Sequence, residues 1–233
     1  MRTSKYFNFY GRKRGKKLSK LQDDFISTYL PKISMPGISY EENPKRGKLK
    51  IKQIFGDSSP VWLEIGFGGG EHLLSIAKKN RNINILGCEL YRNGVAMLLP
   101  RLSKENLNNV RVVMDDARVL LEVLPNSSIT RLYLLFPDPW PKTRHKQRRF
   151  INKDNLKILT RILKTNGLIY IATDVNDYTK HILQIFNDEV NFKWEAESPT
   201  DWRNPWRDWE NTRYFCKAKS SGRKTTFMIF RKL

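Results

Sequence analysis

The sequence lacks long apolar runs, paired cysteines and a secretory leader. No stretch approaches the roughly 18 consecutive apolar residues that a membrane-spanning helix requires. The first 17 residues, MRTSKYFNFYGRKRGKK, contain no apolar segment of the kind found in signal peptides. The only two cysteines, Cys88 and Cys216, have neither the spacing of a metal site nor the number needed for a disulfide framework. We therefore expect a protein of the reducing cytoplasm, without a membrane segment and without a metal ion.

Acidic residues are also scarce. The chain has 43 Lys and Arg against 23 Asp and Glu, which gives a formal net charge of +20 at pH 7. Such a balance indicates a polyanionic partner, most often a nucleic acid, although charge alone does not separate RNA from DNA. The excess is uneven, because residues 1–20 carry eight cations and no acid.

Residues 1–45 are predicted to form a basic N-terminal arm. It contains a helix-like segment near Leu18–Leu30, which Pro31 is expected to stop. We expect the arm to become ordered on nucleic-acid phosphates. Deletion of residues 1–17 should then weaken RNA binding and leave cofactor affinity unchanged.

Residues 46–233 are predicted to form one α/β domain. Its apolar runs, typical of buried strands, lie at 61–67, 83–90, 110–115, 131–137, 168–174 and 225–232. Helix-like segments separate them at 71–79, 96–104, 153–164 and 176–186. This alternation indicates a mostly parallel sheet with helices on both faces.

A glycine-rich turn follows the first predicted strand. The sequence is E-I-G-F-G-G-G at 64–70, with Gly66 and Gly68 where the backbone must approach a ligand closely. The dinucleotide fingerprint G-x-G-x-x-G needs a small residue at position 71, but Glu71 stands there. The turn therefore suits a cofactor that has no pyrophosphate.

Carboxylates occur at the end of every parallel strand of the predicted sheet, where α/β proteins bind ligands. They are Glu64, Glu89, Asp116, Asp138 and Asp174. The position of Glu89 suits the two hydroxyls of a ribose, and Asp116 suits either an adenine amino group or a helix cap. Acids gathered at one edge of a basic protein indicate a cationic ligand, and S-adenosylmethionine carries such charge whereas NAD does not.

Three motifs in this order resemble those of the bacterial tRNA (guanine-N7-)-methyltransferases. They are E-I-G-F-G-G-G at 64–70, F-P-D-P-W-P-K-x-R-H-x-x-R-R at 136–149 and T-D at 173–174. The resemblance covers roughly residues 10–230, and its second motif is the most specific. It implies a Rossmann-like methyltransferase sheet and S-adenosylmethionine-dependent methylation of guanine N7 in tRNA, at a guanosine of the variable loop.

The resemblance also implies roles for individual residues. Asp138 is expected to be the catalytic residue, and the cofactor is expected to contact Glu64, Glu89, Asp116 and Asp138 beside the glycines Gly66 and Gly68. The substrate is expected to contact Lys142, Asp174, Thr212, Arg213 and Tyr214. Phe215 departs from the family, which has a glutamate at this position; Glu210 is one residue that could replace that carboxylate.

The basic run after Asp138, from Lys142 to Arg149, is expected to bind phosphates beside the active site. Trp140 is either a stacking platform for an extruded base or a packing residue, and we favour packing. The tryptophans between positions 194 and 209 are likewise predicted to form a packed cap. The sequence leaves open whether the chain is a monomer or a homodimer.

Three other functions compete with N7 methylation. An amino-directed adenine methyltransferase would place a D/N-P-P-Y/F/W motif at this strand end, but here the second proline follows Trp140. A non-catalytic RNA-binding protein on the same fold would not need the five acids. A NAD-dependent dehydrogenase is disfavoured by Glu71.

Overall fold

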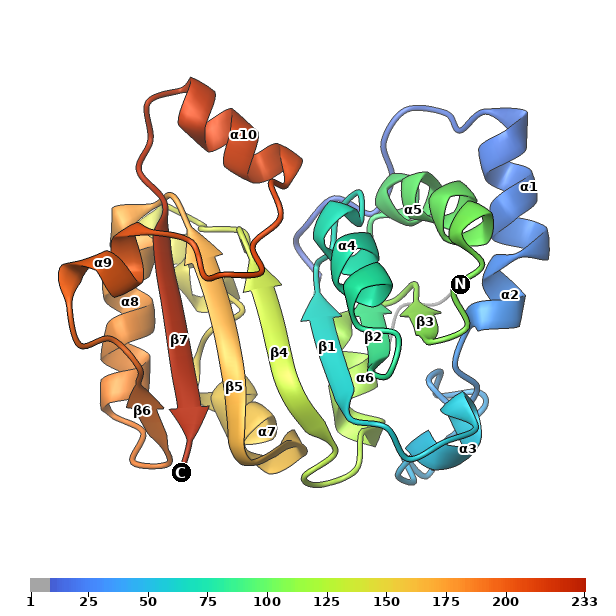
Figure 1. Cartoon of the computed structure of the whole chain (residues 1–233), viewed down its shortest axis with the longest axis horizontal. Coiled ribbons are helices and arrows are strands. Elements are labelled where there is room, and N and C mark those ends of the chain that lie inside the picture. The colour runs from blue at the N-terminus through green and yellow to red at the C-terminus, as the bar shows by residue number, and fades with distance from the viewer. Residues whose placement is uncertain (1–8) are drawn as a thin grey trace.

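The structure is a computed structural model that describes residues 9–233, and these residues contain a seven-stranded sheet of order β3-β2-β1-β4-β5-β7-β6. The strands are β1 (Val61–Ile65), β2 (Asn84–Cys88), β3 (Val110–Val113), β4 (Ile129–Leu135), β5 (Leu163–Thr173), β6 (Phe192–Trp194) and β7 (Thr226–Lys232). The first five pair in parallel, whereas β7 runs antiparallel to both of its neighbours (Figure 1). This confirms the expected α/β fold with a mostly parallel sheet.

Helices cover both faces of the sheet (Figure 1). On one face lie α4 (Glu71–Lys79) and α5 (Arg92–Glu105), and on the other lie α6 (Ala117–Val123), α7 (Lys153–Ile162) and α8 (Asn176–Asn187). The remaining helical elements are α1 (Lys20–Thr28), α2 (Leu30–Ile33), α3 (Ile51–Phe55), the 3-10 helix η1 (Thr143–Arg148), α9 (Pro199–Arg203) and α10 (Arg213–Ser220).

The elements that the sequence did not predict are short. β6 has three residues and α6 has seven, too few for a periodic apolar pattern to stand out. All six predicted strands are present, although β5 begins at Leu163, five residues before the expected start. Pro31 does not simply stop a helix, because α1 ends at Thr28 and Pro31 lies in the first turn of α2, where its missing N–H is not needed.

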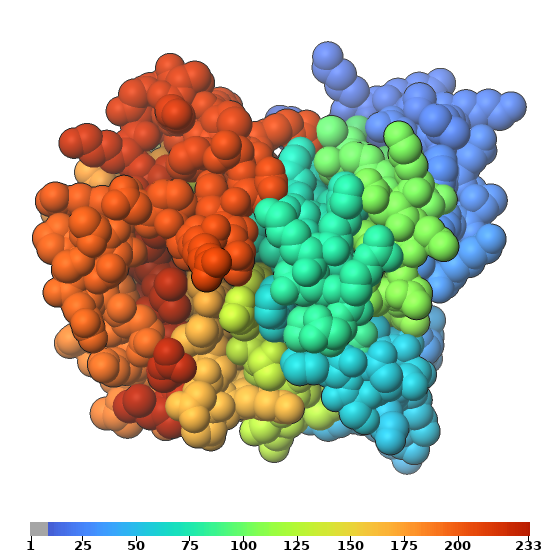
Figure 2. All heavy atoms as spheres, viewed as in Figure 1, coloured from blue at the N-terminus to red at the C-terminus, as the bar shows by residue number. Residues whose placement is uncertain are grey.

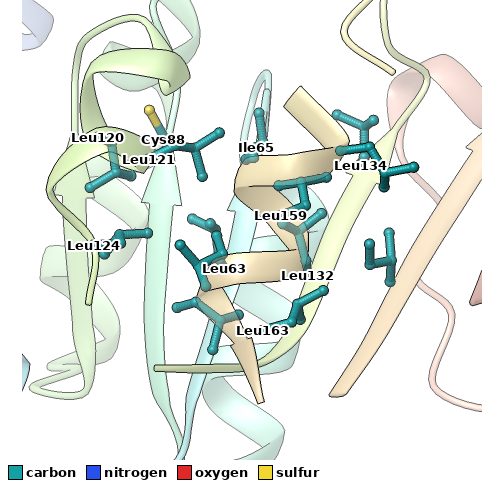
Figure 3. Close-up of a cluster of buried hydrophobic side chains, with 14 of the residues drawn as sticks. Leu63, Ile65, Cys88, Leu120, Leu121, Leu124, Leu132, Leu134, Leu159 and Leu163 are labelled. Carbon is teal, nitrogen blue, oxygen red and sulfur yellow. The ribbon is translucent and has the colours of Figure 1, made fainter. Parts of the chain in front are cut away.

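Apolar side chains form a separate core on each face of the sheet. The first lies under α6, α7 and α8 and includes Leu63 and Leu132 from neighbouring strands (Figure 3). The second lies under α4 and α5 and includes Leu73 and Ile85. Figure 2 shows this second face, where side chains of β4 and β5 are visible between α4 and the C-terminal segment. Both cores leave the carboxyl ends of the parallel strands free to carry a site.

The N-terminal region contributes to both cores. Ile26, Leu30 and Ile33 are buried with the residues of α5, and Met35 and Ile38 join the core on the opposite face. α1 begins with a capping box, in which the Ser19 hydroxyl accepts from Gln22 and the Gln22 side chain accepts from the Ser19 backbone. The basic segment that precedes α1 runs past the carboxyl edge of the sheet (Figure 1).

No helix within residues 9–233 is both long and apolar enough to cross a membrane.

Candidate cofactor and substrate site

A cavity of about 510 Å³ opens at the carboxyl ends of β1, β2 and β4. Of the sequence-predicted site residues, it brings together Gly66, Gly68, Glu89, Asp116, Asp138 and Tyr214. Its lining also includes the hydrophobic residues Ile65, Leu134 and Phe136 and the arm residues Phe9, Tyr10, Gly11 and Arg12. Glu64, Lys142, Asp174, Thr212 and Arg213 do not line it.

The glycine turn connects β1 to α4 along one wall of this cavity. Gly66, Gly68 and Gly70 have φ values of 71°, 56° and 75°, a left-handed region that a side chain disfavours. Gly68 also directs its N–H toward Glu89, whose Oε2 accepts it at 2.8 Å. The turn is therefore held in shape by the acid at the end of the neighbouring strand.

Glu89 is fixed by two backbone donors, Gly68 N–H to Oε2 and Tyr91 N–H to Oε1, both at 2.8 Å. Each carboxylate oxygen keeps a second lone pair, so the side chain can still accept from two hydroxyl groups. Removal from water raises the pKa of Glu89, and the two backbone hydrogen bonds oppose this rise. The arrangement is suited to a ribose, as the sequence predicted.

Asp116 serves as the N-cap of α6, accepting from Arg118 N–H at 2.9 Å. Its carboxylate also receives the guanidinium of Arg118, with Oδ1 3.0 Å from Nε and Oδ2 2.6 Å from Nη2. Of the two readings of Asp116, the helix cap is present in the structure. An adenine amino group would have to share this carboxylate with Arg118.

Asp138 lies between two backbone residues with left-handed conformations, Phe136 (φ 52°) and Trp140 (φ 41°). Such conformations cost about 1–3 kcal/mol each for residues with side chains and tend to occur at functional sites. Pro137 and Pro139 restrict the backbone on either side of Asp138. This strained loop holds Asp138 in the lining of the cavity.

The carboxylate of Asp138 has no hydrogen-bond or ion-pair partner among the described residues. Although its surface is exposed within the cavity, the surrounding walls partly exclude water and raise the pKa of Asp138. An acid held without a partner in a net-basic protein is available to a ligand.

The basic run divides into a buried part and an exposed part. Arg149 is only 1% exposed, donates to the Pro139 carbonyl at 2.8 Å and pairs with Asp177. Lys146 also binds Asp177, at 2.8 Å, and these two cations lower the pKa of Asp177 to about 2. The expectation that the whole run faces phosphate is therefore wrong for Arg149, whereas Lys142 and Arg144 are exposed.

Trp140 is already packed. Tyr10 contacts its ring edge-on at a centroid distance of 6.3 Å, and the Arg148 guanidinium lies 4.0 Å from the Tyr10 ring and 5.1 Å from that of Trp140. His145 contacts the same indole at 5.9 Å. These contacts agree with the packing role favoured from the sequence, and Trp140 also lines the cavity.

The other tryptophans also pack as expected. Trp206 and Trp209 contact each other at 5.0 Å and lie against Phe227 of β7. Trp194 packs against Trp202 at 5.4 Å. This cap holds the chain that leads into α10.

Glu64 lies beneath the cavity rather than in its wall. It is 2% exposed and its Oε2 is 2.8 Å from Nδ1 of His72, which is 1% exposed. The His72 ring packs on Tyr133 at 4.7 Å. The sequence placed no role on His72, because a lone histidine in a helix carries no signal of its acidic partner.

Most predicted substrate residues at the C-terminus make contacts within the chain. Thr212 is the N-cap of α10, Arg213 pairs with Glu71 at 2.9 Å, and Asp174 pairs with Arg223 at 2.6 Å. Tyr214 differs, because it is 58% exposed and its ring borders the cavity beside Gly68.

Phe215, where the resemblance implies a glutamate, packs on Trp209 at 5.4 Å. Glu210 does not line the cavity; it accepts from the Ser75 hydroxyl at 2.8 Å and lies 3.6 Å from Lys79.

The cavity fits S-adenosylmethionine in size and charge. Its volume lies within the roughly 300–1,000 Å³ typical of small-molecule sites. Glu89 offers acceptors for a ribose, the glycine turn allows close approach, and Asp138 offers an unpaired negative charge. The described residues contain no cluster of side chains suited to a metal ion.

Two of the solved structures with a similar fold carry the names of rRNA methyltransferases. A 16S rRNA methyltransferase, KamB, has a TM-score of 0.58 and 12% identity, covering 78% of this chain and 92% of that one. An rRNA methylase from Streptococcus thermophilus has a TM-score of 0.50 and 15% identity, covering 80% and 98%. At this identity the likeness establishes the fold alone.

Sequence relatives are much closer. A family model described as "Putative methyltransferase" matches residues 58–228. Proteins named tRNA (guanine-N(7)-)-methyltransferase are 46% identical in Roseobacter denitrificans, covering 98% of this chain and 97% of the relative, and 46% identical in Ruegeria sp., covering 97% and 88%. The relative in Rhodospirillum rubrum is 37% identical over 96% of this chain and 87% of its own length. The chain thus belongs to the tRNA (guanine-N(7)-)-methyltransferase family.

Proposed function

We propose that this chain methylates guanine N7 in tRNA, with S-adenosylmethionine as the methyl donor. The observation that carries the proposal is Asp138, held without a partner in a cavity beside the glycine turn of a methyltransferase fold. The net charge of +20 and the family of the chain point to tRNA as the polyanion. We propose the cytoplasm as the site of the reaction, because the proposed substrate is tRNA.

The bound cofactor supplies a methyl group on a positively charged sulfur. Guanine N7 has an in-plane lone pair and no proton, so the protein needs no general base. This matches the cavity, because no histidine or lysine is among the described residues that line it. The task left to the protein is to hold the two reactants in line, which is a positioning effect.

Asp138 has two proposed roles in this reaction. Its carboxylate can accept from the N1–H and N2–H edge of guanine and thereby fix which edge faces the methyl group. It also stabilises the positive charge that develops on the base as N7 becomes alkylated. Both roles require the ionised form of Asp138.

The remaining residues are assigned by position. We propose that Glu89 holds the ribose of the cofactor and that Asp116, shared with Arg118, lies at its adenine end, while Gly66 and Gly68 admit its methionine part. Tyr214, whose ring lines the cavity and is 58% exposed, is proposed to stack on the guanine. Lys142, exposed beside the cavity, is proposed to bind a phosphate.

We propose that the predicted site residues that do not line the cavity act through other parts of the protein. They are Glu64, Asp174, Thr212 and Arg213. Glu64 supports the glycine turn through His72, and Thr212 and Arg213 position α10. Asp174 reaches the substrate only if Arg223 gives way to it.

Amino-directed methylation is less compatible with this loop. That chemistry uses a backbone carbonyl next to the acid to receive the target amino group. Here the carbonyl of Pro139, directly after Asp138, already accepts from Arg149 Nε at 2.8 Å. A target amino group would have to share this carbonyl oxygen with Arg149, whereas guanine N7, which carries no hydrogen, needs no such acceptor.

The test is to incubate bulk tRNA with labelled S-adenosylmethionine and to identify the labelled nucleoside. N7-methylguanosine, which also gives strand scission after borohydride and aniline, is the expected product. N6-methyladenosine would overturn the proposal in favour of the amino-directed reaction. Cofactor binding without any labelled nucleoside would favour a non-catalytic RNA-binding protein.

A further inference from the structure

The segment before α1, residues 9–17, crosses the cofactor cavity. Phe9, Tyr10, Gly11 and Arg12 line the same cavity as Glu89 and Asp138. A Cβ added to Gly11 would lie 3.4 Å from Oδ2 of Asp138, so a single methyl group on the strap backbone would contact the proposed catalytic carboxylate. We call residues 9–17 the strap.

The outer half of the strap is fastened to the start of α5. The backbone N–H of Arg92 donates to the carbonyl of Lys13 at 3.0 Å. The amide of Asn93 makes two further bonds, accepting from Gly15 N–H and donating to the Lys16 carbonyl, both at 2.7 Å. The Asn93 side chain thus binds the backbone of two consecutive strap residues, Gly15 and Lys16.

The inner half of the strap is held by a single aromatic residue. Tyr10 contacts the Trp140 ring and the Arg148 guanidinium, which lies closer to each ring than the rings lie to one another, yet Tyr10 is still 48% exposed. All residues from Arg12 to Lys17 are exposed, so the strap buries little apolar surface. An element held by a few accessible polar contacts opens at low free-energy cost.

The outer surface of the strap is strongly cationic. Five of its residues, Arg12, Lys13, Arg14, Lys16 and Lys17, are exposed and positively charged. Arg14, Lys16 and Lys17 also border a second cavity, of about 340 Å³, together with Arg92 and Asn93 of α5. Among the described residues that line this second cavity, the one acidic residue is Asp23, which pairs with Arg92 at 2.9 Å. A concave basic surface of this kind suits a backbone phosphate of tRNA.

We propose that the strap is a movable wall of the cofactor pocket and that tRNA phosphates bound to its cations hold it closed. The proposal rests on the function proposed above and extends it, because it couples cofactor retention to tRNA binding. Coupling of this kind is reciprocal, so bound cofactor must also tighten tRNA binding. This proposal differs from the sequence-based expectation, which was that deletion of residues 1–17 leaves cofactor affinity unchanged.

The first experiment measures S-adenosylhomocysteine binding by calorimetry for Asn93→Ala, with Asn108→Ala as a matched control. Asn108 is an exposed asparagine two residues before the first residue of β3, and the strap hydrogen bonds are made by Asn93 instead. Loss of the two Asn93 hydrogen bonds is expected to weaken binding about tenfold, with no effect in the control. Equal affinity in both variants would overturn the proposal.

Tyr10→Ala gives an independent test should Asn93→Ala disturb α5. Its exposed side chain can be removed without opening either core, and weaker S-adenosylhomocysteine binding is again expected. Trypsin provides a second readout, since the strap offers five cleavage sites. S-adenosylhomocysteine should slow cleavage at Arg12–Lys17 in the wild type, and an unchanged cleavage rate would contradict closure.

The coupling itself is tested by titrating S-adenosylhomocysteine with and without tRNA. Wild-type affinity should rise when tRNA is present, and the Lys16→Gln/Lys17→Gln double variant should lose this gain. A wild-type affinity that does not respond to tRNA would refute the coupling. None of these measurements needs methyl transfer, so a different methylated nucleoside would refute the proposed function and leave the strap standing.

Discussion

The side chain of Arg149 donates through Nε to the carbonyl oxygen of Pro139 at 2.8 Å and binds Asp177 at its other end. It therefore braces the loop that carries Asp138 against the start of α8. The ring of Tyr178 lies beneath the guanidinium, 4.9 Å away. A residue that reads as a phosphate ligand in the sequence is thus part of the frame of the active site.

Arg149→Lys is expected to destabilise the fold by about 2–3 kcal/mol, because a lysine cannot bridge Pro139 and Asp177 and its charge stays buried. Urea unfolding measures the loss. Arg144→Ala, which removes an exposed cation from the same run, should change stability by no more than about 0.5 kcal/mol. Similar losses in the two variants would show that Arg149 is not a brace.

Asp138→Asn is expected to abolish methyl transfer and slightly stabilise the protein. The raised pKa of Asp138 means that its ionised form opposes folding at a pH above that pKa, so a neutral amide removes this cost. The gain should be about 0.5 kcal/mol, since the exposed surface of Asp138 moderates the effect. Thermal unfolding and labelled-tRNA assays give the two readouts, and normal turnover in this variant would remove Asp138 from the reaction.

As the pH is lowered, cofactor binding should weaken at a higher pH than expected for carboxyl groups with ordinary pKa values. Desolvation raises the pKa of Glu89, the proposed ribose ligand, so Glu89 becomes neutral at a pH above the usual value of about 4. Affinity for S-adenosylhomocysteine is therefore present above this pKa and lost as the pH falls through it. Calorimetry across this range should show the loss, and Glu89→Gln should remove this pH dependence.

His72→Leu is expected to cost about 2–4 kcal/mol, because it leaves the Glu64 carboxylate buried without its partner. The double variant Glu64→Leu/His72→Leu should recover part of this loss, since no buried charge remains. Urea unfolding of the two variants measures the difference. An unchanged stability in His72→Leu would mean that Glu64 finds another partner.

Patterns local in the sequence predicted much of the fold and part of the site. Buried strands show as apolar runs, and parallel strands bring their ends to one edge, so Glu89, Asp116 and Asp138 were placed correctly at one cavity. The glycine turn was also visible in the sequence, and the structure shows why glycines occupy it, because Gly66, Gly68 and Gly70 adopt a left-handed backbone that residues with a side chain disfavour.

Contacts between distant parts of the chain could not be predicted in this way. The pairing of Arg149 with Asp177 and of Glu64 with His72 depends on how helices lie on the sheet, which one sequence does not reveal. The contact of Tyr10 with Trp140 joins residues 130 positions apart, and an aromatic residue in a basic arm does not identify its partner.

The antiparallel direction of β7 has a consequence for the design of variants. Since β6 and β7 are paired, the chain between them, residues 195–225, leaves and returns to the same sheet while α10 reaches the cavity with Tyr214. Its two ends lie in β6 and β7, whereas Glu89 follows β2 and Asp138 follows β4. New base preferences can accordingly be selected in the chain between β6 and β7, provided that its contacts with α4, Arg213 with Glu71 and Glu210 with Ser75, are kept.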